Sequence, residues 1–195
     1  MDFVGIYLIL TVVGIFFASK NRSKKTPSKK ANPRANNKKF SLTTADQVRD
    51  RLRSRFKKEP SESDVYWGMY AQNKIEFAIA GEWEKYRDTV FQMAHQLLEE
   101  RKLDRAIEFF FEVCYLDANG FRAKNPGRLD TGVVKKIFEL KKITGNPDEI
   151  LHEMFLKTAF RTQKTMKLKA EPEEVFKQIA IQIEQRERLP ASPEA

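Results

Sequence analysis

Cysteine and histidine are scarce in this chain, and their scarcity limits the chemistry to expect. The 195 residues include one cysteine, Cys114, and two histidines, His95 and His152, which lie far apart. A single cysteine excludes an intramolecular disulfide framework and agrees with a reducing compartment. Neither histidine has cysteine or histidine partners at ligand spacing, so the sequence predicts no structural zinc site.

Recognisable enzyme motifs are also lacking. The chain has no GxGxxG, no phosphate-binding loop with Lys-Ser/Thr, no HExxH and no paired-cysteine motif. Cys114 has no histidine at neighbouring spacing that would activate it as a nucleophile, so we expect a buried, unreactive thiol. The glutamate pairs at 99–100 and 173–174 are expected to be solvated charges at helix ends. The sequence therefore predicts no enzyme, no catalytic residue, no metal and no cofactor.

Charge is absent from residues 3–18, "FVGIYLILTVVGIFFA". A helix rising about 1.5 Å per residue would span roughly 24 Å here, somewhat less than a ~30 Å hydrocarbon core. Basic residues that follow could reach the headgroups and complete the span. We predict an uncleaved single-pass transmembrane anchor over residues 1–19. The alternative is a removed signal peptide, although no positive residue precedes the run and "FAS" is a poor cleavage site.

Positive charge is concentrated immediately after this run. Nine basic residues and no acidic one lie between positions 20 and 39, whereas residues from 40 onward carry 27 basic and 26 acidic side chains. The nine are Lys20, Arg22, Lys24, Lys25, Lys29, Lys30, Arg34, Lys38 and Lys39. Because positive charge favours the cytoplasmic side, the anchor is predicted to leave the N-terminus outside the cell membrane and the body in the cytoplasm.

Residues 20–42 are rich in Lys, Asn, Ser and Pro, which predicts a disordered basic linker. It would serve as a stop-transfer signal and spacer. It could also adhere to anionic lipid, at about 1 kcal/mol per basic residue near the surface. Nucleic-acid binding by this linker is the weakest of the three, because no aromatic residue is interleaved for base stacking.

Residues 43–189 predict an all-α domain, because apolar residues recur there at helical spacing and few runs alternate as strands do. Residues 190–195 are expected to form a flexible tail. The predicted helices cover residues 45–58, 61–80, 82–101, 104–116, 131–144 and 147–160, with a last one opened by "EPEE" and ending before Pro190. The first of them is basic and amphipathic, and it could lie on the membrane surface or dock against the other helices.

Capping residues predict several helix ends. Thr44 and Gln47 form a capping-box pattern, and Asp104 and Asn146 are expected N-caps. Glycines that can adopt positive φ are expected to end three helices, and they are Gly81, Gly120 and Gly145.

The stretch "AHQLLEERKLDRAIEFFFEVCYLDA" resembles one tetratricopeptide-type unit, over residues 87–120. The hairpin packing positions that match are Ala94, Leu97, Ala106, Phe110 and Leu116. Arg101 stands where that family usually has glycine, and Ala118 replaces its terminal proline. No second copy follows at the usual spacing of about 34 residues, although helices 131–144 and 147–160 predict a second, irregular hairpin. The resemblance implies a helical-hairpin fold that binds proteins. Part of the stretch, "FEVCYLDANG", also resembles uncharacterised prokaryotic and phage proteins, which implies no activity.

A loop between the two predicted hairpins carries Arg122, Lys124 and Arg128 with no acidic residue from 119 to 128. It could bind an anion or an acidic segment of a partner. The simpler interpretation is a long connection between hairpins, which we favour.

Together these patterns predict a membrane-anchored helical-repeat adaptor, or scaffold, that holds a protein partner at the cytoplasmic face. The alternative function is a membrane-associated nucleic-acid-binding protein that uses the basic linker and the Arg-rich helix 45–58.

Overall fold

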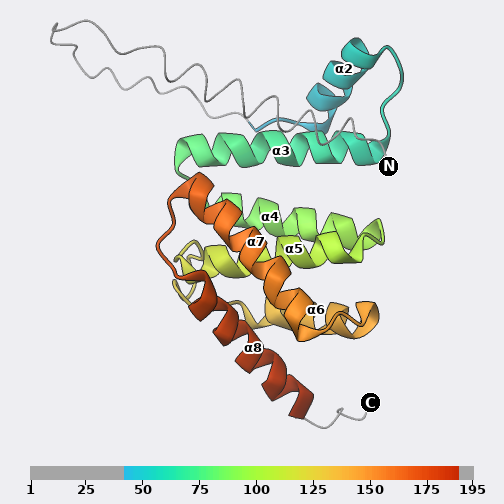
Figure 1. Cartoon of the computed structure of the whole chain (residues 1–195). Coiled ribbons are helices and arrows are strands. Elements are labelled where there is room, and N and C mark those ends of the chain that lie inside the picture. Colours follow the sequence, from blue (N-terminus) through green and yellow to red (C-terminus); the bar gives the residue numbers. More distant parts are fainter. Residues whose placement is uncertain (1–41, 189–195) are drawn as a thin grey trace, which may run out of the picture. The chain divides into compact units, whose positions relative to one another are not determined.

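The computed structural model describes residues 42–188, which form seven α-helices and no strand (Figure 1). The helices are α2 (Ala45–Phe56), α3 (Glu62–Ala80), α4 (Trp83–Glu99), α5 (Leu103–Ala118), α6 (Thr131–Thr144), α7 (Asp148–Met166) and α8 (Pro172–Arg188). The all-α prediction is thus confirmed for this part of the chain. The predicted anchor, the linker up to residue 41 and the tail lie outside the described residues. None of the seven helices is long and apolar enough to cross a membrane.

The chain divides into two compact units, with the boundary between Gln72 and Asn73, inside α3. In the first unit, the predicted capping box is confirmed. The backbone N–H of Gln47 donates to Thr44 Oγ1 at 3.3 Å, and the N–H of Thr44 donates to Gln47 Oε1 at 3.1 Å. This exchange satisfies donors that the helix leaves free at the start of α2.

Val48 of α2 is buried against Gly68 of α3. A Cβ atom on Gly68 would lie 2.6 Å from Val48 Cγ1, so glycine is required for this approach. The basic amphipathic helix was predicted either to lie on the membrane surface or to dock against other helices. At Val48, α2 docks against α3.

The second unit is built around α5, which packs against α4, α6, α7 and α8. Its side chains Phe110, Phe111, Tyr115 and Leu116 have no exposed surface. The phenylalanines meet different neighbours: Phe110 lies edge-on to Phe91 of α4, with ring centroids 6.0 Å apart, whereas Phe111 lies edge-on to Phe155 of α7 at 5.4 Å. A helix that is apolar around most of its circumference must be covered on most sides. From Ala106 to Asp117, all residues of α5 except Glu108 and Phe109 are buried.

Helix α6 and helix α7 differ from the predicted second hairpin. Each packs extensively against α5 and against α8, rather than mainly against the other. The reason lies in α5, whose apolar surface is wide enough to accept both helices. Helix α7 also continues to Met166, where the apolar pattern predicted an end at 160; Thr158 and Thr162 are buried on this longer helix.

The helix ends confirm the glycine predictions and correct two N-caps. Gly81, Gly120 and Gly145 end α3, α5 and α6 with φ of 72°, 84° and 70°. The predicted caps Asp104 and Asn146 are wrong. Helix α5 starts at Leu103 after Lys102, and α7 starts at Asp148 after Pro147, both without a side-chain cap. The Asn146 amide instead donates to Asp104 Oδ1 at 3.0 Å and joins the starts of the two helices.

Candidate functional site

The hairpin packing positions predicted from sequence are all buried, and they lie on α4 and α5, two helices that pack against each other. Ala94, Ala106, Phe110 and Leu116 have no exposed surface, and Leu97 is 4% exposed. The two helices pack along each other and are joined by a short turn.

That turn places Arg101 at a φ of 55°, the left-handed region. The Arg101 N–H donates to the carbonyl of Leu98 and the Lys102 N–H to the carbonyl of Leu97, each at 2.9 Å. This pair of bonds is a Schellman motif, which glycine usually closes because it has no Cβ. The position where the sequence departs from the resembled family is therefore one whose backbone suits glycine.

The loop predicted as a possible anion site is held by a buried ion-pair network. Arg87 is 7% exposed, and its guanidinium donates to both carboxylate oxygens of the fully buried Asp117, at 2.9 and 3.3 Å. It also donates to Asp130 at 3.2 Å, and the backbone N–H of Asp130 donates to Asp117 at 3.1 Å. Asp130 in addition caps α6 through Gly132 N–H at 2.9 Å. No local sequence pattern predicts this network, because its members come from α4, α5 and the loop.

Of the three basic residues predicted in this loop, Arg122 forms an ion pair with Asp130 at 3.2 Å. Lys124 and Arg128 are exposed. The charge of Arg122 is thus partly balanced by a carboxylate that also serves Arg87 and the start of α6. The geometry assigns Arg122 a part in fixing the loop.

A second ion pair, which is partly buried, links the end of α3 to α5 within the second unit. Lys74 Nζ lies 2.8 Å from Glu112 Oε1 and 5.0 Å from the centroid of the Tyr86 ring. Burial raises the pKa of Tyr86 to about 12, Glu112 adds to this rise, and Lys74 opposes it. Burial opposes the charge of Lys74, but its pKa is raised because Glu112 and Tyr86 together outweigh that effect. The side chain of Glu112 is only 6% exposed.

Cys114 is a free, fully buried cysteine, as predicted. Burial raises its pKa well above the ordinary value, and the carboxylate of Asp117 adds to this rise. The thiol therefore stays protonated and screened from reagents in the folded chain.

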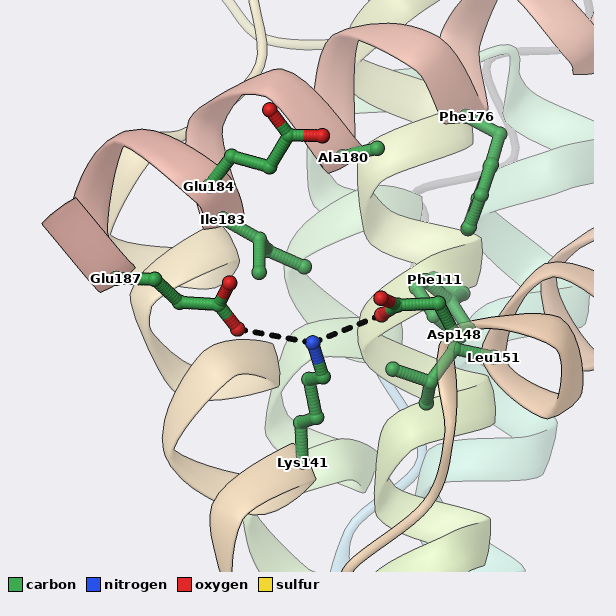
Figure 2. Close-up of a pocket in the computed structure, with 9 residues that line it drawn as sticks. All are labelled: Phe111, Lys141, Asp148, Leu151, Phe176, Ala180, Ile183, Glu184 and Glu187. Atoms are coloured by element: carbon green, nitrogen blue, oxygen red, sulfur yellow. Dashed lines mark hydrogen bonds and ion pairs between the residues drawn. The ribbon is translucent and has the colours of Figure 1, made fainter.

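A cleft of about 150 Å³ lies among α5, α6, α7 and α8 (Figure 2). Its lining has an apolar part and a charged part. The apolar side chains are Phe111, Leu151, Phe176, Ala180 and Ile183, and the charged ones are Lys141, Asp148, Glu184 and Glu187. Phe111 and Leu151 are fully or almost fully buried, so they form the floor.

Lys141 lies at the centre of the charged part and joins three helices. Figure 2 shows its ammonium group between the carboxylates of Asp148 on α7, at 2.8 Å, and Glu187 on α8, at 2.9 Å. Burial opposes the charge of Lys141, but the two hydrogen bonds raise its pKa, so it is an ammonium ion at neutral pH. Neither the cleft nor the pair of ion pairs made by Lys141 was predicted, because no local sequence pattern brings residues 111, 148 and 187 together.

The basic residues predicted for membrane or nucleic-acid contact fall in two groups. The nine between Lys20 and Lys39 lie outside the described residues. In α2, Arg49 pairs with Asp46 at 2.7 Å and with Glu62 at 3.0 Å, and Arg53 pairs with Glu59 at 2.7 Å. Two of the arginines of this helix thus have acidic partners within the first unit.

Within residues 42–188, no three histidine, cysteine or acidic side chains are grouped so that they could hold a metal ion. Comparisons with protein-family models, with curated proteins and with solved structures found no match to this chain.

Proposed function

We propose that this protein is a single-pass membrane adaptor, whose helical domain holds a protein partner at the cytoplasmic face. The observation that carries the proposal is the cleft among α5–α8, which combines an apolar floor with a charged rim. Interfaces commonly consist of an apolar anchor in a pocket surrounded by polar contacts. A chain with such a cleft and an uncharged N-terminal run has the two elements that an adaptor needs.

Support for a tetratricopeptide-like character comes from the α4–α5 hairpin. The small residues Ala94 and Ala106 are fully buried on two helices that pack against each other, and Arg101 has a φ of 55°, a conformation that suits the glycine usual at this position of the family. Helical hairpins of this kind commonly present concave surfaces to partner proteins.

Anchoring at the membrane would strengthen partner binding without any additional contact between the domain and its partner. A partner that is also at the membrane meets the domain at a high local concentration, so that weak contacts suffice. The basic residues between 20 and 39 would keep the domain near an anionic leaflet.

The second candidate function is nucleic-acid binding at the membrane, and the nine basic residues between 20 and 39 favour it. Against it, Arg49 and Arg53 of α2 already have acidic partners, which leaves less positive charge for phosphates. We therefore prefer the adaptor.

Membrane fractionation tests the anchoring part of this proposal. The full chain should stay with membranes through alkaline extraction, and a variant lacking residues 3–18 should move to the soluble fraction. A tag after Ala195 should be digested by protease only when the cytoplasmic side is accessible. Alkaline release of the full chain, or protection of the tag on that side, would contradict the proposal.

A further inference from the structure

We infer that the cleft among α5–α8 accepts a partner segment that inserts one large apolar side chain and places lysine or arginine beside it. The inference rests on the proposed function for the existence of a protein partner, and it specifies the chemistry of that partner. The surface is the nine-residue lining drawn in Figure 2.

The size of the cleft limits what it can hold. Small-molecule and cofactor sites usually enclose about 300 Å³ or more, twice the volume found here. A cavity of about 150 Å³ lined by apolar side chains is large enough for benzene. The cleft therefore fits one leucine- or phenylalanine-sized group and little more.

The floor favours an apolar group at that point. Phe111 is completely buried, Leu151 is 1% exposed and Ile183 is 6% exposed, and Phe176 and Ala180 are only partly covered. An apolar side chain that enters the cleft would displace water from these surfaces, which is favourable in proportion to the area covered.

The charged residues at the rim of the cleft determine which charge is favoured in the partner segment. Three carboxylates and one ammonium group line the cleft, so their charges sum to −2. The side chains of Asp148, Glu184 and Glu187 are 74%, 61% and 44% exposed, whereas that of Lys141 is 17% exposed between two of them. Arg188 balances part of the charge of Glu184, at 3.5 Å.

An approaching segment thus meets carboxylates first. The cation at the centre already has two acidic partners and cannot offer its charge freely to an anion. Complementary charge steers association and disfavours partners of the wrong sign. An acidic or phosphorylated segment is therefore disfavoured at this cleft, and a basic one is favoured.

The test uses the full chain in nanodiscs of zwitterionic lipid, with empty nanodiscs as background. The probe is a short fluorescent peptide with a single leucine flanked by lysines in a glycine–serine sequence, and binding is followed by anisotropy. Ala180→Leu fills the cleft and should weaken binding by about tenfold or more, because the leucine anchor loses its place. Gln178→Leu, the control, introduces a leucine side chain at an exposed position of α8 outside the cleft lining. It should leave peptide binding unchanged.

Charge is tested separately. Glu184→Gln should weaken binding about threefold, and raising the salt concentration should weaken it further. Glu174→Gln, an exposed glutamate of α8 outside the cleft, is the matched control. Peptides with leucine changed to serine, or with lysine changed to glutamate, should bind more weakly than the probe.

Each opposite result overturns the inference. Failure of the probe to bind the folded chain, equal binding to the Ala180→Leu variant, or equal binding of the glutamate peptide would each do so. Tighter binding of the probe after the nine basic residues between 20 and 39 are changed to serine would also overturn it. That result would mean that this chain's own basic segment occupies the cleft. Membrane retention of the full chain is measured separately by fractionation, so a failure of the cleft inference can be distinguished from a failure of the proposed anchoring.

Discussion

Buried and partly buried charged side chains of the second unit form pairs of opposite charge. Arg87 and Asp117 are joined by two hydrogen bonds, and Lys74 and Glu112 by one of 2.8 Å. An unpaired buried charge is strongly destabilising, whereas a pair with well-placed hydrogen bonds can be tolerated. These residues hold together the end of α3, α4, α5 and the loop after α5 within the second unit.

Tyr86 is predicted to make the protein less stable in alkali. Its phenol ionises near pH 10 in the unfolded chain, whereas burial raises its pKa to about 12 in the fold. Between these values the unfolded chain releases the proton first, so stability falls as pH rises, by up to about 3 kcal/mol. Lys74 acts in the same direction, because its raised pKa gives stability that is lost above the pKa of the unfolded lysine.

Urea unfolding at about pH 9 and about pH 11.5 measures this loss. Tyr86→Phe should reduce the fall in the free energy of unfolding between the two conditions, while Tyr66→Phe, an exposed residue of α3, should not. Identical pH slopes for the wild type and the Tyr86→Phe variant would refute the burial argument.

At the scale of elements, the turn between α4 and α5 offers a simple stability test. Arg101 has a φ of 55°, which is unfavourable for any residue with a Cβ. Arg101→Gly should therefore stabilise the protein by about 0.5–1 kcal/mol, after the greater freedom of glycine in the unfolded chain is subtracted.

The neighbouring Glu100 is the control, because its φ is −79° and glycine gives no advantage there. Glu100→Gly should destabilise the protein. Thermal unfolding compares the two variants with the wild type, and a lower melting temperature for Arg101→Gly would show that the turn is not strained.

Several elements could be predicted from local sequence because the responsible interaction is local. The capping box of Thr44 and Gln47 spans one turn, and each of Gly81, Gly120 and Gly145 ends its own helix. Helical spacing of apolar residues was enough to predict seven helices.

Features that depend on distant residues could not be predicted in this way. Glu112 is buried because Lys74, 38 positions away in sequence, meets it. The cleft exists because α6 and α7 both pack against α5 and α8, which leaves Lys141 beside Glu187, 46 positions further on. Asn146 has the side chain of a helix N-cap, but its amide donates a hydrogen bond to Asp104 of another helix. In each case a tertiary contact outweighs the local pattern.

At the scale of the whole molecule, the proposed function joins two properties of the chain. An uncharged run followed by nine basic residues predicts a membrane anchor, and a helical unit with an acidic, apolar cleft suits a partner protein. If the basic segment acted mainly on nucleic acid instead, what the chain binds in the cell would depend on salt and on intact nucleic acid.

Crosslinked capture from native membranes, with and without nuclease, tests the central claim most directly. The full chain is compared with a variant in which Lys20 and Arg22 are kept, so that the orientation is preserved, and the other seven basic residues between 24 and 39 are changed to serine. The adaptor account predicts that both chains retain the same defined set of proteins after nuclease treatment. Capture that requires both the basic residues and intact nucleic acid would contradict it.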